Sequence, residues 1–179
     1  MSSWATLNVA IWINYALYQA GWFTCVLGAA WQHPVAGCAV AVALMAAHVA
    51  MSSQRGLEIR LILLAATIGV AAEAFMIASG TYRFTSGVVI SSLPPPWLVA
   101  LWAQFATTFR FALAGVIKHP VRAVLFGAAG GPLAFLAADR LGAVTLLPPI
   151  STGLLRLSLV WAAALFIFSV VTPPLASEA

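Results

Sequence analysis

The chain has 179 residues, of which 63% are hydrophobic and only 7% are charged, and its mean hydropathy is +1.03. Soluble domains are about half apolar and about a quarter charged, so this composition excludes an ordinary soluble domain and indicates a membrane protein. The net charge of +4 comes from eight Lys or Arg against four acids, too few cations for the basic surface of a nucleic-acid-binding protein.

Six apolar segments each come close to the roughly 20 residues that a helix needs to cross the hydrocarbon of a bilayer. We predict spans at about residues 7–31, 35–51, 59–79, 97–117, 122–139 and 153–172. The second and fifth segments are short, so five spans are the alternative. The predicted fold is an all-α, polytopic transmembrane helical bundle that forms a single domain over residues 1–179.

The positions of the cations predict an orientation. No Lys or Arg precedes the first apolar segment, and the segment is longer than the apolar part of a signal peptide, so we expect it to remain as a helix. Six spans place both termini on one side, together with Arg55, Arg60, Lys118 and Arg122. Three arginines lie on the other side, and the positive-inside tendency therefore favours termini in the cytoplasm.

Two predicted outer loops share a pattern. Residues 87–97 and 142–152 each run from glycine through β-branched and apolar residues to consecutive prolines, and a predicted helix follows each loop. Proline is well tolerated at a helix start, so both loops are expected to be rigid starts of helices. The alternative is a pair of short re-entrant segments that cover a cavity.

Aromatic residues lie near the ends of several predicted spans. Trp4, Trp31, Trp97 and Tyr82 occupy such positions. Trp and Tyr are enriched where the bilayer meets water, so we expect these four to form an interfacial belt.

The fifth span contains a helix-packing signal. Gly127 and Gly131 have the spacing that lets two helices approach closely, and Pro132 follows directly. The partner helix is expected in the same chain, with a second copy of the chain as the alternative.

The fourth span contains polar residues in an apolar sequence. Gln104, Thr107 and Arg110 recur in steps of three, so a continuous helix would place them in one stripe. A cation near the bilayer centre costs about 2.5 to 3.5 kcal/mol on insertion scales, so Arg110 should have a polar partner. The alternative is that its long side chain reaches the headgroups.

Helix geometry predicts which polar residues share a depth in the bilayer. At about 1.5 Å per residue, Glu73 and Gln104 lie at similar depths, and Arg110 lies deeper, near Asn14 and His48. We therefore expect two polar levels, with Glu73 and Gln104 toward the outside and the other three toward the cytoplasm. Purely structural hydrogen bonding by Glu73, His48 and Asn14 is the alternative.

These residues are the candidates for a site within the membrane. Glu73 and Arg110 are the catalytic candidates, as a proton donor or acceptor and as a group that holds an anionic head. The substrate-binding candidates are Asn14, His48, Gln104 and Thr107. No phosphate loop, dinucleotide fingerprint, nucleophile elbow or zinc motif is present, and the spacing of the histidines and cysteines predicts no metal site. The sequence assigns no cofactor.

Three blocks of the sequence carry a family resemblance. They contain Asn14 to Trp22, Trp97 to Thr108, and Gly130 to Pro132, and they resemble an uncharacterised bacterial inner-membrane family known only as a domain of unknown function. Family members often have Asp where this chain has Glu73, and other polar residues where it has Arg110. The resemblance implies a multi-span protein of the inner membrane, often encoded near enzymes that modify membrane lipids.

Two classes of function follow from these observations. In the first, the polar levels form a site that binds an acyl or isoprenoid substrate during lipid modification. In the second, the protein is a non-enzymatic partner or scaffold for lipid-modifying enzymes, and its polar groups only fix the helices. A small lipid or solute transporter acting as an oligomer is a further alternative. The expected partners are membrane lipid and either a membrane protein or a second copy, with no nucleic acid.

Overall fold

The computed structural model describes the backbone of residues 3–173 and the side chains of residues 9–173. Within this part, the helices are α1 (Ser3–Ala30), α2 (Pro34–Met51), α3 (Arg55–Ala78), α4 (Pro96–Ala106), α5 (Ala114–Ile117), α6 (Pro120–Arg140) and α7 (Ile150–Val171). The strands are β1 (Tyr82–Phe84) and β2 (Val144–Leu146). Three of the helices begin with proline, whose fixed φ and missing N–H suit the first helical position.

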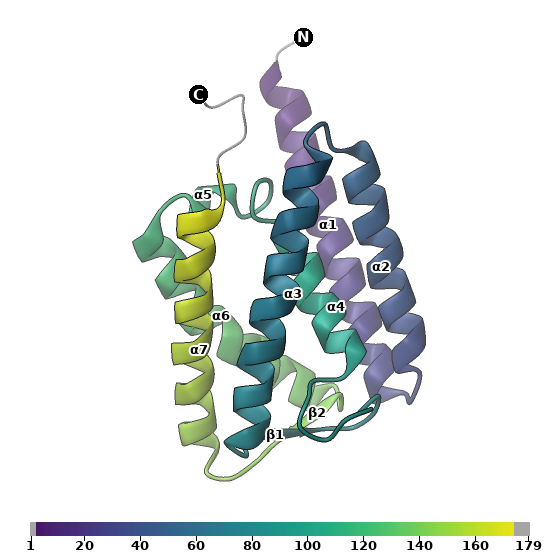
Figure 1. The fold of residues 1–179 in the computed structure, drawn as a ribbon, viewed down its shortest axis with the longest axis vertical. Helices are drawn as coiled ribbons and strands as arrows, with labels where there is room; N and C mark the ends of the chain where they lie inside the picture. The colour runs from purple at the N-terminus through teal and green to yellow at the C-terminus, as the bar shows by residue number, and fades with distance from the viewer. Residues whose placement is uncertain (1–2, 174–179) are drawn as a thin grey trace.

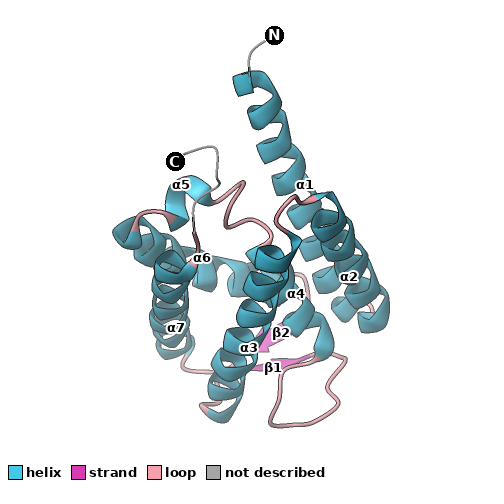
Figure 2. Cartoon of the chain, turned by 45° about the horizontal axis from the view of Figure 1, so that its top comes forward, coloured by secondary structure: helices cyan, strands magenta, loops and turns pink. Residues whose placement is uncertain are grey.

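The helices form two groups that meet along one side. One group contains α1, α2, α3 and α4, and the other contains α5, α6 and α7. Figure 1 shows α6 and α7 side by side on the left, α1 and α2 on the right, and α3 and α4 between them. The start of α1, the end of α7, the α2–α3 turn and α5 lie at one end of the molecule, and β1 and β2 lie at the opposite end (Figures 1 and 2). An aromatic cavity lies between α1 and α4 on one side and α6 and α7 on the other.

Four helices of the described chain are long and apolar enough to cross a membrane, namely α2, α3, α6 and α7. The protein therefore has the character of a membrane-embedded helical protein. The predicted six spans are not confirmed. In α1 the polar residues Asn14 and Gln19 interrupt the apolar sequence, and α4 has only 11 residues, which is too short to cross the hydrocarbon.

The prediction of one continuous helix over residues 97–117 is wrong. Regular helix ends at Ala106, turns occupy residues 107–113, and α5 follows as a single turn. The hydroxyls of Thr107 and Thr108 donate to carbonyl oxygens three residues earlier, at 2.7 and 2.6 Å. Such local bonds compete with helical bonding, and contacts from α1 and α3 to the same turns hold the break in place. Gln104 and Arg110 consequently do not share a stripe on one helix.

A small sheet adds to the predicted all-α fold. β1 and β2 pair antiparallel, with Tyr82 opposite Leu146 and Phe84 opposite Val144. The second of the two proline-containing loops supplies β2 before the start of α7, and the first loop leads into α4 at Pro96. The pairing joins the segment after α3 to the segment after α6, so it links the two groups of helices (Figure 2).

The predicted aromatic belt is wrong for two of its members. Trp97 and Tyr82 are only 1% and 3% exposed, because Trp97 packs edge-on against Phe84 and Tyr82 stacks on Phe135. Trp31 is 67% exposed beside the turn that follows α1. The side chain of Trp4 lies outside the described residues.

Gly127 and Gly131 lie where α6 packs against α7 in the same chain. A Cβ atom on Gly127 would overlap the backbone of Trp161, and one on Gly131 would overlap the ring of Trp161. Pro132 follows within the same helix. The two glycines therefore let the indole of Trp161 lie directly on the backbone of α6, and this use leaves neither glycine at a surface that a second copy could contact in the same way.

Candidate functional site

Arg110 lies in a buried polar cluster whose central residue is Glu58. Arg110 Nη1 donates to Glu58 Oε1 at 2.6 Å, and Arg110 Nη2 donates to Gln54 Oε1 at 2.9 Å. His48 Nε2 lies 3.2 Å from the other carboxylate oxygen of Glu58. The side chains of Arg110 and Glu58 are 2% and 1% exposed. We refer to Glu58, Arg110, Gln54 and His48 as the Glu58 cluster.

Asn14 of α1 also holds the break after α4. Its Nδ2 donates to the Thr107 carbonyl oxygen at 3.0 Å, and its Oδ1 accepts from the Ala112 amide at 3.3 Å. Both backbone groups lie in turns and lack the partner that a regular helix would provide. The Asn14 side chain therefore supplies a donor to one and an acceptor to the other. Asn14 and His48 both contact the turns that contain Arg110, but at different points, because Asn14 bonds Thr107 and Ala112 whereas the His48 ring packs edge-on against Phe111.

Glu58, the direct partner of Arg110, is not among the residues predicted from the sequence. The predicted third span began at residue 59, which placed Glu58 in a solvated loop where a carboxylate needs no partner. In the structure α3 begins at Arg55, so Glu58 falls in its first turn, where the helix dipole favours a negative charge. Glu58 precedes Glu73 by slightly more than four turns, and that spacing puts both carboxyls on the buried face of α3.

Glu73 has different partners from those predicted. Trp102 Nε1 donates to Glu73 Oε1 at 2.9 Å, and the hydroxyl of Tyr82 donates to Glu73 Oε2. The carboxyl is 1% exposed. Gly69, one turn earlier, has no side chain, which leaves the space that the Trp102 indole occupies. In the sequence, this contact is indicated by Gly69, which lies one turn before Glu73 on the same helix face. A glycine at that position leaves room for a large hydrogen-bond donor such as tryptophan beside the carboxyl.

Gln104 does not contact Glu73, which corrects the predicted outer level. Its Nε2 donates to the Leu17 carbonyl oxygen of α1 at 3.2 Å. A Cβ atom on Gly21 would overlap the Gln104 amide, so the side chain lies in the hollow that this glycine leaves. Gln104 therefore fixes α4 against α1. Thr107, the next candidate, bonds the Gln104 carbonyl oxygen.

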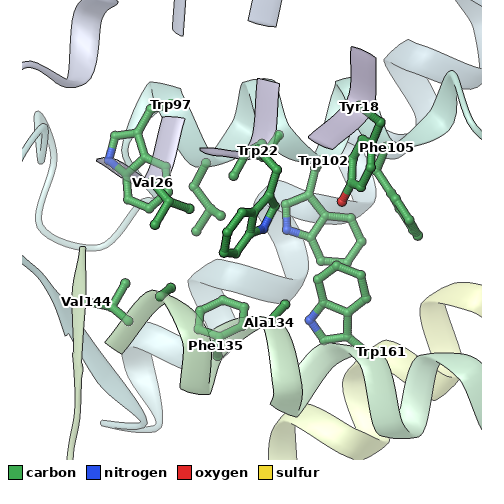
Figure 3. Close-up of a pocket in the computed structure, with 13 residues that line it drawn as sticks. Tyr18, Trp22, Val26, Trp97, Trp102, Phe105, Ala134, Phe135, Val144 and Trp161 are labelled. Atoms are coloured by element: carbon green, nitrogen blue, oxygen red, sulfur yellow. The ribbon is translucent and has the colours of Figure 1, made fainter. Parts of the chain in front are cut away.

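An aromatic cavity lies between the two groups of helices. Figure 3 shows Trp22 and Trp102 approaching it from α1 and α4, and Phe135 and Trp161 from α6 and α7. The Trp102 and Trp161 rings stack with centroids 4.4 Å apart. This cavity measures about 50 Å³, and a wider one of about 350 Å³ adjoins it and shares Tyr18, Phe105, Ala134 and Trp161. We call the two together the aromatic groove.

The wider part of the aromatic groove has a more mixed lining. Tyr15, Gln19 and Thr108 contribute polar atoms, and Leu113 and Phe126 contribute apolar surface. The narrow part ends near Val144 of β2. The groove therefore runs from a small aromatic end beside the sheet to a wider end beside the break after α4, where the polar groups lie.

Glu73 connects two walls of the aromatic groove without facing it. Trp102, which it holds directly, lines the narrow part. Tyr82, its other partner, stacks on Phe135 of the facing wall with ring centroids 4.7 Å apart. One carboxyl of α3 thus fixes an aromatic ring on α4 and, through Tyr82, one on α6.

The candidate catalytic residues lie behind the walls of the groove. Neither Glu73 nor Arg110 lines either part of it. Both carboxyl oxygens of Glu73 and both terminal nitrogens of Arg110 have partners within the protein. In this arrangement the two side chains act on the shape of the groove and on the packing of helices. Among the described residues, no three His, Cys, Asp or Glu side chains come together as a metal site would require.

Comparison with known proteins gives one match. The model of a family described as "Protein of unknown function (DUF2878)" matches residues 11–167. No curated protein and no solved structure matches the chain. The matched range includes Asn14, the Glu58 cluster, Glu73 and the whole lining of the aromatic groove.

Proposed function

We propose that this chain, which belongs to the family described as "Protein of unknown function (DUF2878)", holds the hydrocarbon chain of a membrane lipid in the aromatic groove. The single observation that carries the proposal is the lining of the groove. Seven aromatic side chains from α1, α4, α6 and α7 surround its narrow end: Tyr18, Trp22, Trp97, Trp102, Phe105, Phe135 and Trp161. For a chain with four helices long and apolar enough to cross a membrane, acyl and isoprenoid chains are the abundant apolar ligands.

The dimensions of the groove support a chain that enters by its tip. A water molecule needs a cavity volume of about 10 to 15 Å³, so the narrow cavity of about 50 Å³ has room for only a few atoms. The wider cavity of about 350 Å³ takes the part of the chain that follows. Tyr15, Gln19 and Thr108 then lie where a polar group on the same molecule can form hydrogen bonds.

The positions of the polar residues favour binding over catalysis by those residues. Glu73 is a positioning residue in this account, because it holds Trp102 and Tyr82 and does not face the groove. Arg110 stabilises the break after α4 through Glu58. This arrangement favours a non-enzymatic partner that presents a lipid to modifying enzymes over an enzyme that uses Glu73 and Arg110 for chemistry.

The connection to lipid modification rests on the family resemblance carried by the Asn14, Trp97 and Gly130 blocks. We place the protein in the bacterial inner membrane on the same ground, and the distribution of its cations favours cytoplasmic termini. The connection to lipid modification is tested by the lipid profile of cells that lack the gene. Altered acyl or isoprenoid species in those cells support a role in modification, and an unchanged profile contradicts it.

The binding proposal is tested by photo-crosslinking in vesicles. The probes are a phosphatidylcholine with a diazirine near the end of one acyl chain, and a diazirine-bearing isoprenoid alcohol. We expect adducts on Tyr18, Ala134 or Trp161, which both parts of the groove share. Adducts confined to outward-facing residues such as Leu133 and Leu159, which are 64% and 63% exposed, would overturn it.

A further inference from the structure

A second groove lies on the opposite side of α4 from the aromatic groove. Helices α2 and α3 share a short turn but diverge from it, and α4 lies between them (Figure 1). Two open hollows on the surface, of about 500 and 430 Å³, follow this space and share Val42 and Met45. The first lies between α2 and α3 near their common turn, and the second continues toward Pro96 and Ala103 of α4. We call the two together the α2–α3 groove.

The lining of the α2–α3 groove is apolar apart from one cation at its end. Arg55 is the only charged residue in the wall near the shared turn, and the other lining residues are apolar: Val42, Met45, Ala46, Val49, Ala50, Ile59, Ile62 and Leu63. Val42, Ile59 and Leu63 are 51%, 45% and 61% exposed, so the groove opens to the surroundings of the protein. An apolar channel that ends at a guanidinium matches a molecule with a hydrocarbon chain and an anionic head.

The Arg55 guanidinium is fixed in place and available to an anion. Its Nη2 donates to the Ala50 carbonyl oxygen at 2.9 Å, which holds the side chain across the end of α2. Among the side chains of residues 9–173, no carboxylate lies at salt-bridge distance from Arg55, and the nearby Glu58 pairs with Arg110 and His48. The remaining N–H groups of a guanidinium are strong donors to phosphate oxygens.

The backbone beside Arg55 also favours an anion. Arg55 is the first residue of α3, and the Leu57 and Glu58 amides bond the Gln54 carbonyl oxygen, so the Arg55 and Gly56 amides are the ones of the first turn that can meet another acceptor. Gly56 follows, and a Cβ atom placed on it would meet nothing within 4 Å. A phosphate at the guanidinium can therefore approach the positive end of the α3 dipole without obstruction.

We propose that the α2–α3 groove binds one anionic phospholipid, with an acyl chain along Val42 and Met45 and its phosphate at Arg55. This site is separate from the aromatic groove and does not depend on the function proposed for it. Basic positions between membrane helices at one face of the bilayer are where anionic headgroups bind.

A second copy of the chain is a poorer fit to the same groove. A helix that filled it would need to offer an acidic residue to Arg55. The chain has four acids; Glu58 and Glu73 are buried, and Glu178 lies outside the described residues. Asp139, the remaining acid, lies near the end of α6 and accepts from the Leu146 amide of β2, at the opposite end of the molecule from Arg55 (Figure 1).

The test is a lipid titration of the full chain in detergent, followed by native mass spectrometry. Phosphatidylglycerol and phosphatidylcholine with identical acyl chains are titrated in parallel against the wild type, Arg55→Gln and Arg60→Gln. Arg60 is the matched control, because it is an exposed arginine of the same helix that does not line the groove. We expect one phosphatidylglycerol bound in preference to phosphatidylcholine, and affinity about fivefold lower in Arg55→Gln only.

A second variant tests the groove itself. Ala46 lines it and is exposed, so Ala46→Trp should fill the space while Arg55 stays in place, and the same preference should be lost. Equal losses in Arg55→Gln and Arg60→Gln would indicate a general charge effect and overturn the proposal, as would no preference in the wild type. A chain dimer that Ala46→Trp dissociates would also overturn it, by assigning the groove to a second copy.

Discussion

Arg110 Nη1 lies 2.6 Å from Glu58 Oε1, although the two residues are 52 positions apart in the chain. The contact joins the turns that follow α4 to the first turn of α3, and both side chains are buried. A cation in an apolar sequence is thereby paired with a carboxylate, and His48 lies on the other oxygen of the same group. The pair explains why the chain tolerates an arginine within its interior.

Breaking the Arg110–Glu58 pair should destabilise the protein strongly. Arg110→Met leaves a buried carboxylate without its main partner, and such a loss typically costs about 3 to 5 kcal/mol. The double variant Arg110→Met with Glu58→Met should cost less than the sum of the two single variants, because neither charge is then left alone. Unfolding in mixed micelles with increasing SDS measures the free energies.

The same cycle with Glu73 in place of Glu58 is the control. Glu73 bonds Tyr82 and Trp102 and has no contact with Arg110, so the effects of Arg110→Met and Glu73→Gln should add. Strong coupling between Glu73 and Arg110 would contradict the separation of the two polar clusters.

Asn14 should be needed to keep the break after α4 ordered. Asn14→Leu has a similar volume but leaves the Thr107 carbonyl and the Ala112 amide without their partner, at about 1 to 3 kcal/mol for each group. Hydrogen exchange at the Ala112 amide should become faster. Tyr15→Phe, at the neighbouring exposed position, should change stability by no more than about 0.5 kcal/mol. Unchanged exchange at Ala112 would remove Asn14 from this role.

Two neighbouring glycines of α6 should differ sharply in their tolerance of alanine. Gly127→Ala places a methyl group against the Trp161 backbone, which cannot move aside, and we expect a loss of about 1 to 3 kcal/mol. At Gly130 the nearest atom to a Cβ is 3.7 Å away, so Gly130→Ala should be neutral or stabilise by up to about 1 kcal/mol. Similar stabilities of the two variants would contradict the observed α6–α7 packing.

Substitutions at Glu73 should separate hydrogen bonding from charge. Glu73→Gln keeps an oxygen for the Trp102 indole, whereas Glu73→Leu leaves both this donor and the Tyr82 hydroxyl unpaired. The Leu variant should lose about 1 to 3 kcal/mol per unpaired group and the Gln variant clearly less. Near-ultraviolet circular dichroism should report the loss of the Trp102 environment in the Leu variant. Equal effects of Gln and Leu would show that the charge, and not the hydrogen bonds, matters.

The sequence predicted the membrane character of the protein because apolar composition and helix length decide it directly. The physical cost of burying Glu73 and Arg110 predicted that both would have polar neighbours, and both side chains are indeed buried and bonded. The partners themselves were harder to predict. Glu58 was missed because an error of four residues in a helix boundary moved it from a helix face to a loop.

The break after Ala106 could not be predicted from the local sequence. Residues 97–117 are apolar enough for one helix, and two threonines alone rarely end one. The helix ends because contacts from α1 and α3, through Asn14 and Glu58, hold residues 107–113 in turns. The aromatic groove depends on the same long-range arrangement, since its walls come from four helices and no periodicity in one segment reveals it.

The most direct test of the proposed lipid site compares two adjacent substitutions on α6. Ala134 lines both parts of the aromatic groove, whereas Leu133 is 64% exposed on the outer face. Crosslinking of the diazirine-bearing lipid at Tyr18 and Trp161 is quantified for the wild type, Ala134→Phe and Leu133→Phe. The account predicts that Ala134→Phe abolishes most of the adduct and that Leu133→Phe retains it. Equal yields in all three proteins would contradict it.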